Sequence, residues 1–270
     1  MAAVGRRADP KIAGMDREQV GFALRHLYGY PRLRLAYTYI PKNACTALKR
    51  TLGHAQGWLT AESRSAHEMR RTWWLSGLAS YPLARDRVVV VRDPFDRVLS
   101  AYYSKFVLAR DGIAEQAMAT GLAAALRPGA TRDDVTFADF VGYLSRTPDR
   151  VLDDHWRPQH DFLIGSYNQV VRFDRLDEDS GFLRQRGLAL DPAGARATST
   201  IATDLGTGWS DRPAARLRVL RRRRGLLPSG ESMYDDRLRA VIGERFGDDV
   251  DLVARATAGR PLRAARHGGG

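Results

Sequence analysis

The pattern of apolar and polar positions in the first part of the chain predicts a helix, a strand and a second helix. Apolar residues recur at helical spacing over residues 15–28, and residues 33–40 are rich in strand-forming side chains and end before Pro41. Asn43 is placed to cap a helix over residues 44–52, which Gly53 would end. A strand, a short loop and a helix in this order are typical of a parallel α/β sheet.

A second unit of the same kind follows. Residues 61–79 have a helical pattern, and residues 87–91 (RVVVV) form a continuous apolar run, which is typical of a strand buried on both faces. Asp93 is a candidate cap and Pro94 the first residue of the next helix. Two such units predict an α/β fold with a P-loop-NTPase-like parallel sheet flanked by helices, in a single domain with helical additions.

The rest of the chain has weaker patterns. Residues 111–135 are rich in alanine and glycine and contain RPGATRDD, which suggests a mobile surface excursion. Residues 136–144 resume a helix, residues 190–212 have a loop composition, and residues 234–254 form a terminal amphipathic helical region.

Length and composition fit one catalytic domain. The chain has 270 residues, of which 44% are hydrophobic, and this is enough to build one sizeable core. We expect a helical extension over residues 1–30, a catalytic domain over residues 31–256 and a disordered basic tail over residues 257–270.

Cysteine content and hydropathy indicate a compartment. Cys45 is the single cysteine, which excludes an internal disulfide, and no Cys/His cluster has the spacing of a metal site. The N-terminal residues carry charges where a signal peptide needs an apolar run, and no later stretch has the length of a membrane span. We therefore expect a cytoplasmic protein without a bound metal.

The formal net charge of +12 points to an anionic partner. Much of the excess lies in residues 216–224, which include the run Arg221 to Arg224, and in residues 260–267. Such runs are usually solvated faces or frayed ends, but they also motivate the alternative of a basic nucleic-acid-binding protein. The sequence contains no helix-turn-helix, RNP or zinc pattern, so no nucleic-acid partner is expected.

The first loop between strand and helix is a candidate anion site. A loop in this position exposes backbone N–H groups at the positive end of a helix dipole. Its residues are Pro41, Lys42, Asn43, Ala44, Cys45 and Thr46. Lys42 adds a positive charge, and the Thr46 hydroxyl adds a donor. The loop lacks the GxxxxGK[ST] pattern, which disfavours an ordinary ATPase and leaves a kinase with an atypical P-loop as an alternative.

The second loop adds a candidate phosphate site. Arg92 stands at the end of the predicted strand, and Ser100 lies two turns into the following helix. The fork of an arginine suits a terminal phosphate, and a hydroxyl can complete its ligand shell.

At these two loops the chain resembles the sulfotransferases that use 3′-phosphoadenosine 5′-phosphosulfate (PAPS), and most closely the Golgi carbohydrate sulfotransferases and their bacterial relatives. YTYIPKNACTALKRTL looks like the 5′-phosphosulfate loop of that family, and VVVVRDPFDRVLSAYYSKF looks like its 3′-phosphate element. The resemblance continues into TFADFVGYL and DDHWRPQHDFLIGSYNQVVRFDRLDED.

The resemblance implies a function. The loop from Pro41 to Thr46 would bind the phosphosulfate, Arg92 and Ser100 would bind the 3′-phosphate, and the acceptor would be a hydroxyl of a carbohydrate or a glycosylated small molecule. Vertebrate members of the family have a membrane anchor and luminal cysteines, which this sequence lacks. We therefore expect a bacterial cytosolic member of the family.

Sulfuryl transfer requires charge stabilisation at the bridging oxygen and a base for the acceptor proton. Lys42 is placed for the first task. For the second task the histidine candidates are His67 and His155. His67 lies between the two loops, where sulfotransferases generally place their catalytic histidine, and His155 matches an HW pair of the carbohydrate family. Glu62 and Glu68 are carboxylate alternatives.

Overall fold

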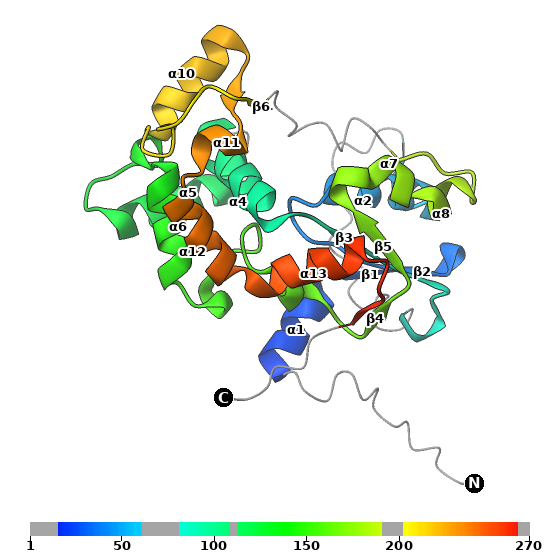
Figure 1. Cartoon of the computed structure of the whole chain (residues 1–270). Coiled ribbons are helices and arrows are strands. Elements are labelled where there is room, and N and C mark those ends of the chain that lie inside the picture. The colour runs from blue at the N-terminus through cyan, green and yellow to red at the C-terminus, as the bar shows by residue number, and fades with distance from the viewer. Residues whose placement is uncertain (1–15, 61–80, 109–112, 191–201, 264–270) are drawn as a thin grey trace, which may run out of the picture. The chain divides into compact units, whose positions relative to one another are not determined.

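The computed structural model of the chain describes residues 16–60, 81–108, 113–190 and 202–263 (Figure 1). Two compact units divide these residues. The sheet unit comprises Met1–Arg92, Pro158–Gly194 and Asp251–Gly270, and the helical unit comprises Asp93–Arg157 and Ala195–Val250. The chain passes from the sheet unit to the helical unit between Arg92 and Asp93.

A four-stranded sheet with the order β1-β2-β3-β5 lies at the centre of the sheet unit. Its strands are β1 (Leu27–Tyr30), β2 (Leu35–Thr38), β3 (Asp86–Val91) and β5 (Gln169–Arg172). The strands β2, β3 and β5 are parallel, and β1 adds an antiparallel edge. A parallel core of this kind confirms the predicted α/β fold, in which loops with functional residues follow the carboxyl ends of the strands.

Strand β3 is buried on both faces, as its unbroken run of valines predicts. Val88 and Val90 pack with Leu48 and Leu52 on one face. Val89 and Val91 belong to a separate cluster on the other face. Alternate side chains of a strand point to opposite faces, so each face needs its own helical cover.

Helices supply this cover. The helices of the sheet unit are α1 (Arg17–Arg25), η1 (Pro31–Leu33), α2 (Cys45–Gln56), η3 (Tyr81–Leu83), η7 (Gln159–Phe162), η8 (Phe173–Arg175), α7 (Leu176–Asp179) and α8 (Gly181–Arg184). Side chains of α2 and α8 share a cluster with Val88 and Val90, and those of α1 and η7 share one with Val89 and Val91. A short antiparallel pair, β4 (Ser166–Tyr167) and β8 (Leu262–Arg263), completes the unit.

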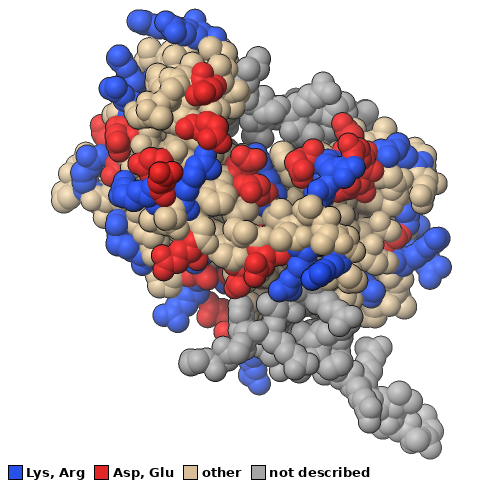
Figure 2. Space-filling model, in the orientation of Figure 1, with Lys and Arg blue, Asp and Glu red and all other residues tan. Residues whose placement is uncertain are grey.

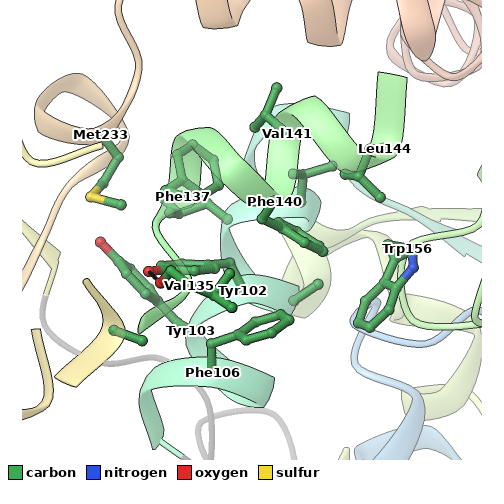
Figure 3. Close-up of a cluster of buried hydrophobic side chains, with 14 of the residues drawn as sticks. Tyr102, Tyr103, Phe106, Val135, Phe137, Phe140, Val141, Leu144, Trp156 and Met233 are labelled. Carbon is green, nitrogen blue, oxygen red and sulfur yellow. Dashed lines mark hydrogen bonds between the residues drawn. The ribbon is translucent and has the colours of Figure 1, made fainter. Parts of the chain in front are cut away.

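The helical unit is organised around a large apolar cluster (Figure 3). Its elements are α4 (Pro94–Tyr102), the π-helix η4 (Tyr103–Leu108), α5 (Ile113–Leu126), η5 (Arg132–Asp134), α6 (Phe137–Arg146), η6 (Asp149–Val151), β6 (Ala202–Thr203), α10 (Ala214–Arg224), β7 (Leu227–Pro228), α11 (Gly230–Met233) and α12 (Asp236–Arg245). Helix α13 (Gly247–Thr257) begins in this unit and ends in the sheet unit. Tyr102 and Phe106 stack with ring centroids 5.5 Å apart, which joins α4 to the π-helix that follows it.

Several predicted elements are confirmed. Strand β3 has nearly its expected bounds. Asp93 caps α4, with Pro94 as its first residue, because the carboxylate accepts hydrogen bonds from the N–H groups of Phe95 and Asp96. Helix α6 begins after Thr136, whose hydroxyl accepts from the N–H of Asp139 and forms a capping box with it.

Other predicted elements are wrong in their bounds or their kind. Helix α1 ends at Arg25 and not at residue 28, since the next residues form strand β1. Helix α2 continues through Gly53 to Gln56, and Gly57 ends it with a positive φ of 80°. The stretch read as a mobile excursion contains helix α5. The terminal region consists of two helices, α12 and α13.

Some predictions fall on residues outside the description. These are the helix over residues 61–79, most of the tail and part of the loop over residues 190–212. Residues 262–263 of the predicted tail form strand β8. The division into residues 1–30, 31–256 and 257–270 stays a prediction. Among the described helices, none combines the length and the apolar content that a membrane crossing requires.

Candidate functional site

The loop between β2 and α2 has an unusual backbone. Lys42 and Ala44 have positive φ angles of 72° and 54°, which non-glycine residues seldom adopt. Ala44 is the N-cap residue of α2, and within the described part of the chain no side chain caps this helix. The first turn of α2 therefore has the backbone arrangement of an anion cradle, in which N–H groups bind an external anion at the positive end of the helix dipole.

Asn43 does not cap the helix, contrary to our prediction, because its side chain is turned into the protein. It is fully buried. Its amide nitrogen Nδ2 donates to the carbonyl oxygen of Val90 at 2.8 Å and to Oε1 of Gln159 at 2.6 Å. Asn43 thus fixes the loop to the neighbouring strand β3. Its Oδ1 atom is also buried and accepts no hydrogen bond from the described residues.

Gln159 connects this loop to the second one, and sequence reasoning missed it. Its Oε1 atom accepts from the N–H of Arg92 at 3.0 Å as well as from Asn43. Its Nε2 atom donates to the carbonyl oxygen of Arg92 at 2.8 Å. Gln159 is fully buried and begins η7. Its position inside the DDHWRPQ segment, which carries part of the family resemblance, was the available signal.

Arg92 is oriented by contacts on two sides. Its Nη1 atom donates to the carbonyl oxygen of Lys42 at 2.9 Å. Its guanidinium carbon lies 4.1 Å from the ring centroid of Phe173, in a cation–π arrangement. The half-buried guanidinium is therefore held against the first loop, which places a positive charge beside the anion cradle.

The remaining predicted loop residues differ in exposure. Pro41 and Ala44 are buried, Lys42 and Cys45 are half-buried, and Thr46 is exposed. The side chains of Lys42, Cys45 and Thr46 are thus the ones with surface available to a ligand. Ser100 lies on α4 in the helical unit and is half-buried.

His155 pairs with a carboxylate in the helical unit. Its Nδ1 atom lies 2.6 Å from Oδ1 of Asp153, and its backbone N–H donates to the same oxygen. Burial alone would raise the pKa of Asp153, but the hydrogen bond and the charge of His155 outweigh burial and hold this pKa below its usual range. An ionised Asp153 requires Nδ1 of His155 to donate, so Nε2 is the ring nitrogen that can take a proton.

Two further observations describe the segment around His155. The buried guanidinium of Arg97 donates to the carbonyl oxygens of Arg157 at 2.8 Å and Asp154 at 3.3 Å, which fixes the backbone on both sides of His155. Trp156 points into the apolar cluster of Figure 3 and is 1% exposed, so it is a core residue.

A pocket of about 330 Å³ borders this segment, entirely within the helical unit. Its lining residues include Leu122 and Gly121 of α5, Tyr143 of α6, and Asp153. Its surface is mixed polar and apolar and includes the carboxylate of Asp153, which suits a ligand with both apolar and hydroxyl groups.

The other candidate bases lie outside the described residues. These are His67, Glu62 and Glu68. Their prediction therefore stays a prediction. The described residues contain no group of three or more His, Cys, Asp or Glu side chains in a metal-binding arrangement.

The arginine run lies on α10, where Figure 2 shows a group of basic side chains. Arg218 of this helix pairs with Asp133 at 2.9 Å. By contrast, Arg216, Arg222, Arg223 and Arg224 are exposed, and no described carboxylate lies within 4.0 Å of them. Their positive charge would attract an anionic macromolecule.

Comparison with known proteins adds independent information. A family model described as "Sulfotransferase family" matches residues 25–200, which include both loops, Gln159 and His155. The chain is similar to carbohydrate sulfotransferase 14 of Mus musculus, with 32% identity over 58% of this chain and 45% of that protein. It is also similar to carbohydrate sulfotransferase 11 of Mus musculus, with 27% identity over 72% of this chain and 63% of that protein.

The chain spans about half to two thirds of the length of these curated relatives. No solved structure gives a significant match to the chain.

Proposed function

Because this chain belongs to the sulfotransferase family, we propose that it transfers a sulfuryl group from PAPS to a hydroxyl of a carbohydrate or a glycosylated small molecule. The names of its relatives support a carbohydrate acceptor. The observation that carries the proposal is the uncapped start of α2, beside which Arg92 is fixed. A cytoplasmic location stays a prediction of the sequence.

The first loop fits a phosphosulfate group. Three features support the fit: the helix start has no side-chain cap, the side chain of Asn43 is withdrawn into the core, and Lys42 is half-buried at the loop. In the proposed role, the backbone N–H groups at the start of α2 bind the phosphate oxygens. Arg92 and Ser100 are the ligands of the 3′-phosphate that the resemblance assigns.

The reaction places one demand on each side of the sulfur. The acceptor oxygen forms a bond to sulfur while the bond from sulfur to the phosphate oxygen breaks, and the electron pair of that bond remains on the phosphate oxygen. Lys42 stabilises the negative charge that develops there. The acceptor proton passes to a base, for which His67 and His155 are the two candidates.

The described geometry supports His155 as a base. Asp153 fixes Nδ1, and Arg97 fixes the backbone of the segment, so the ring has a defined orientation. The adjoining pocket would hold the part of the acceptor that does not react, with its hydroxyl groups toward Asp153. This arrangement parallels other catalytic histidines that a carboxylate orients.

Nucleotide binding tests the donor. We expect adenosine 3′,5′-bisphosphate (PAP) to raise the melting temperature in moderate salt, whereas ATP and duplex DNA do not. A rise with ATP alone would favour the atypical kinase. The exposed arginines of α10 favour nucleic-acid binding as the second candidate function, and a rise with DNA alone would overturn the sulfotransferase proposal.

Two substitutions distinguish the candidate bases. General-base assistance contributes about 10² to 10⁴ in rate. Replacement of the true base by alanine should cut turnover by such a factor, abolish the acidic limb of the pH-rate profile and leave PAP affinity nearly intact. The variants to compare are His67→Ala and His155→Ala. Near-normal turnover in His155→Ala together with a loss in His67→Ala would assign the base to His67, and the reverse would assign it to His155.

A further inference from the structure

We propose that Gln159 is the positioning residue that sets the relative placement of the two PAPS-binding loops. This inference rests on the proposed function. One buried amide contacts both loops: it accepts from the side chain of Asn43 in the first loop, and it accepts from and donates to the backbone of Arg92 in the second.

Gln159 uses both polar atoms of its side-chain amide to bond to the two loops at the same time. Its Oε1 atom is the shared acceptor for Nδ2 of Asn43 and the N–H of Arg92, at 2.6 and 3.0 Å. Its Nε2 atom closes a second bond to the carbonyl oxygen of Arg92. Glutamate could accept both bonds but could not donate the third, and methionine of similar length could form none of them.

The hydrogen bonds of Gln159 act at a point where a small displacement of either loop changes the shape of the anion cradle. Asn43 lies between Lys42 and Ala44, the two residues of this loop with positive φ, so its side chain fixes the strained turn that begins the anion cradle. Arg92 in turn donates to the carbonyl oxygen of Lys42. The side chains of Asn43 and Gln159 and the backbone of Arg92 thus form one hydrogen-bond network. Removal of the Gln159 amide takes one acceptor from Nδ2 of Asn43, and it takes these partners from the backbone N–H and the carbonyl oxygen of Arg92.

Gln159 itself is fixed from the protein core. It begins η7, whose last residue, Phe162, is fully buried. The ring of Phe162 lies 4.8 Å from that of Phe22 of α1. The short helix that carries Gln159 is therefore anchored in the core of the sheet unit, which is what a positioning residue requires.

The decisive test measures the two phosphate subsites separately. Adenosine 5′-phosphate reports on the first loop, adenosine 3′-phosphate on the second, and PAP on both. We expect Gln159→Met to weaken binding of all three nucleotides, by roughly 10-fold to 100-fold for PAP, because displaced loops lose charge-assisted hydrogen bonds to the phosphates. Thermal unfolding without nucleotide shows that the variant is folded.

Two variants keep the test decisive. Gln159→Glu retains the acceptor for Asn43 and for the N–H of Arg92, but it loses the donor and adds a buried negative charge, so we expect it to weaken binding of all three nucleotides as well. Gln169→Leu is the matched control, since Gln169 donates to Asp86 at the opposite end of β3 and its loss should leave all three affinities unchanged.

Each outcome has one meaning. If the wild-type chain does not bind PAP, the proposed function fails. If it binds PAP and folded Gln159→Met binds all three nucleotides like the wild type, the positioning role is overturned. A loss for only one of the two monophosphates in Gln159→Met also overturns it, because Gln159 would then act on a single loop.

Discussion

The two junctions between strand and helix look alike in the sequence but complete their helices in opposite ways. At the second junction, Asp93 accepts from the N–H groups of Phe95 and Asp96, so its own carboxylate supplies the negative charge at the start of helix α4. At the first junction, α2 begins at Cys45, and its N-cap residue Ala44 provides no side-chain cap. The first helix is therefore prepared for an external anion and the second is not.

This difference separates the tasks of the two loops. The first loop offers backbone N–H groups and the charge of Lys42 to a ligand. The second offers the side chain of Arg92, which donates a hydrogen bond to the carbonyl oxygen of Lys42. A capped helix start contributes to stability in every ligand state. An uncapped start contributes fully only when an anion is bound. Substitutions at the two junctions should therefore affect different measured quantities.

The largest effect is expected at the first loop. Lys42→Ala should lower turnover by about 10² to 10³ and weaken PAP binding less, because the charge matters most where the bridging oxygen becomes negative. The carbonyl oxygen that accepts from Arg92 is unchanged in this variant, so the hydrogen bond between the two loops is retained. Steady-state kinetics and calorimetry check the result. Equal losses in both quantities would make Lys42 a binding residue only.

At the second junction the expected effect is on affinity. Arg92→Ala should weaken PAP binding by about 1.5 to 3 kcal/mol and Ser100→Ala by about 0.5 to 1.5 kcal/mol, as for ionic and neutral hydrogen bonds. Arg92→Lys should not restore the loss, since a lysine cannot reproduce the fork and the stacking on Phe173. Calorimetry measures both losses, with Arg175→Ala, an exposed arginine paired with Glu178, as the control. Unchanged affinity in both variants would defeat the 3′-phosphate assignment.

The cap of α4 should affect stability and leave affinity unchanged. Asp93→Ala should lower the free energy of unfolding by about 0.5 to 2 kcal/mol, because two N–H groups lose their acceptor. Asp93→Asn should recover most of this loss. Asp235→Ala, which removes the cap of α12, is a matched control with a similar cost. Urea unfolding measures these values. A large loss of PAP affinity in Asp93→Ala would contradict the separation of tasks.

The sequence predicted the parts of these junctions that depend on local chemistry. The valine run of β3 and the Asp93-Pro94 start of α4 are written in neighbouring residues, and the structure confirms both. The role of Asn43 could not be read in this way. Its partner Gln159 is distant in the chain, and a left-handed conformation at Ala44 overrides the local preference of asparagine to cap a helix.

Helix α5 shows a different reason for error. Alanine is the strongest helix former, but the glycines in this stretch and the RPG signal after the helix suggested a mobile surface excursion. The surroundings of His155, one of the two candidate bases, were also only partly predictable. The pairing of His155 with Asp153 was visible as a near-neighbour pair in DDHW, yet the orientation of the ring depends on Arg97, which lies far away in the sequence.

The smallest effect is expected at Ala44, and it tests whether the uncapped start depends on the left-handed turn. Ala44→Gly relieves about 1 kcal/mol of backbone strain. It loses the burial of one methyl group, about 0.8 kcal/mol, and glycine adds about 0.5 to 1 kcal/mol of chain entropy to the unfolded state. These contributions nearly cancel, so the free energy of unfolding should stay within about 1 kcal/mol of the wild type and PAP affinity should persist.

Ala44→Val should lower both the free energy of unfolding and the affinity for PAP more than Ala44→Gly does. A β-branched residue tolerates a φ of 54° poorly, so the turn must open and the N–H groups of α2 must move. Urea unfolding and calorimetry on the pair of variants separate strain from the loss of the methyl group. If Ala44→Val binds PAP as tightly as Ala44→Gly, the left-handed turn does not shape the anion cradle, and the contrast between the two junctions would rest on the absence of a cap alone.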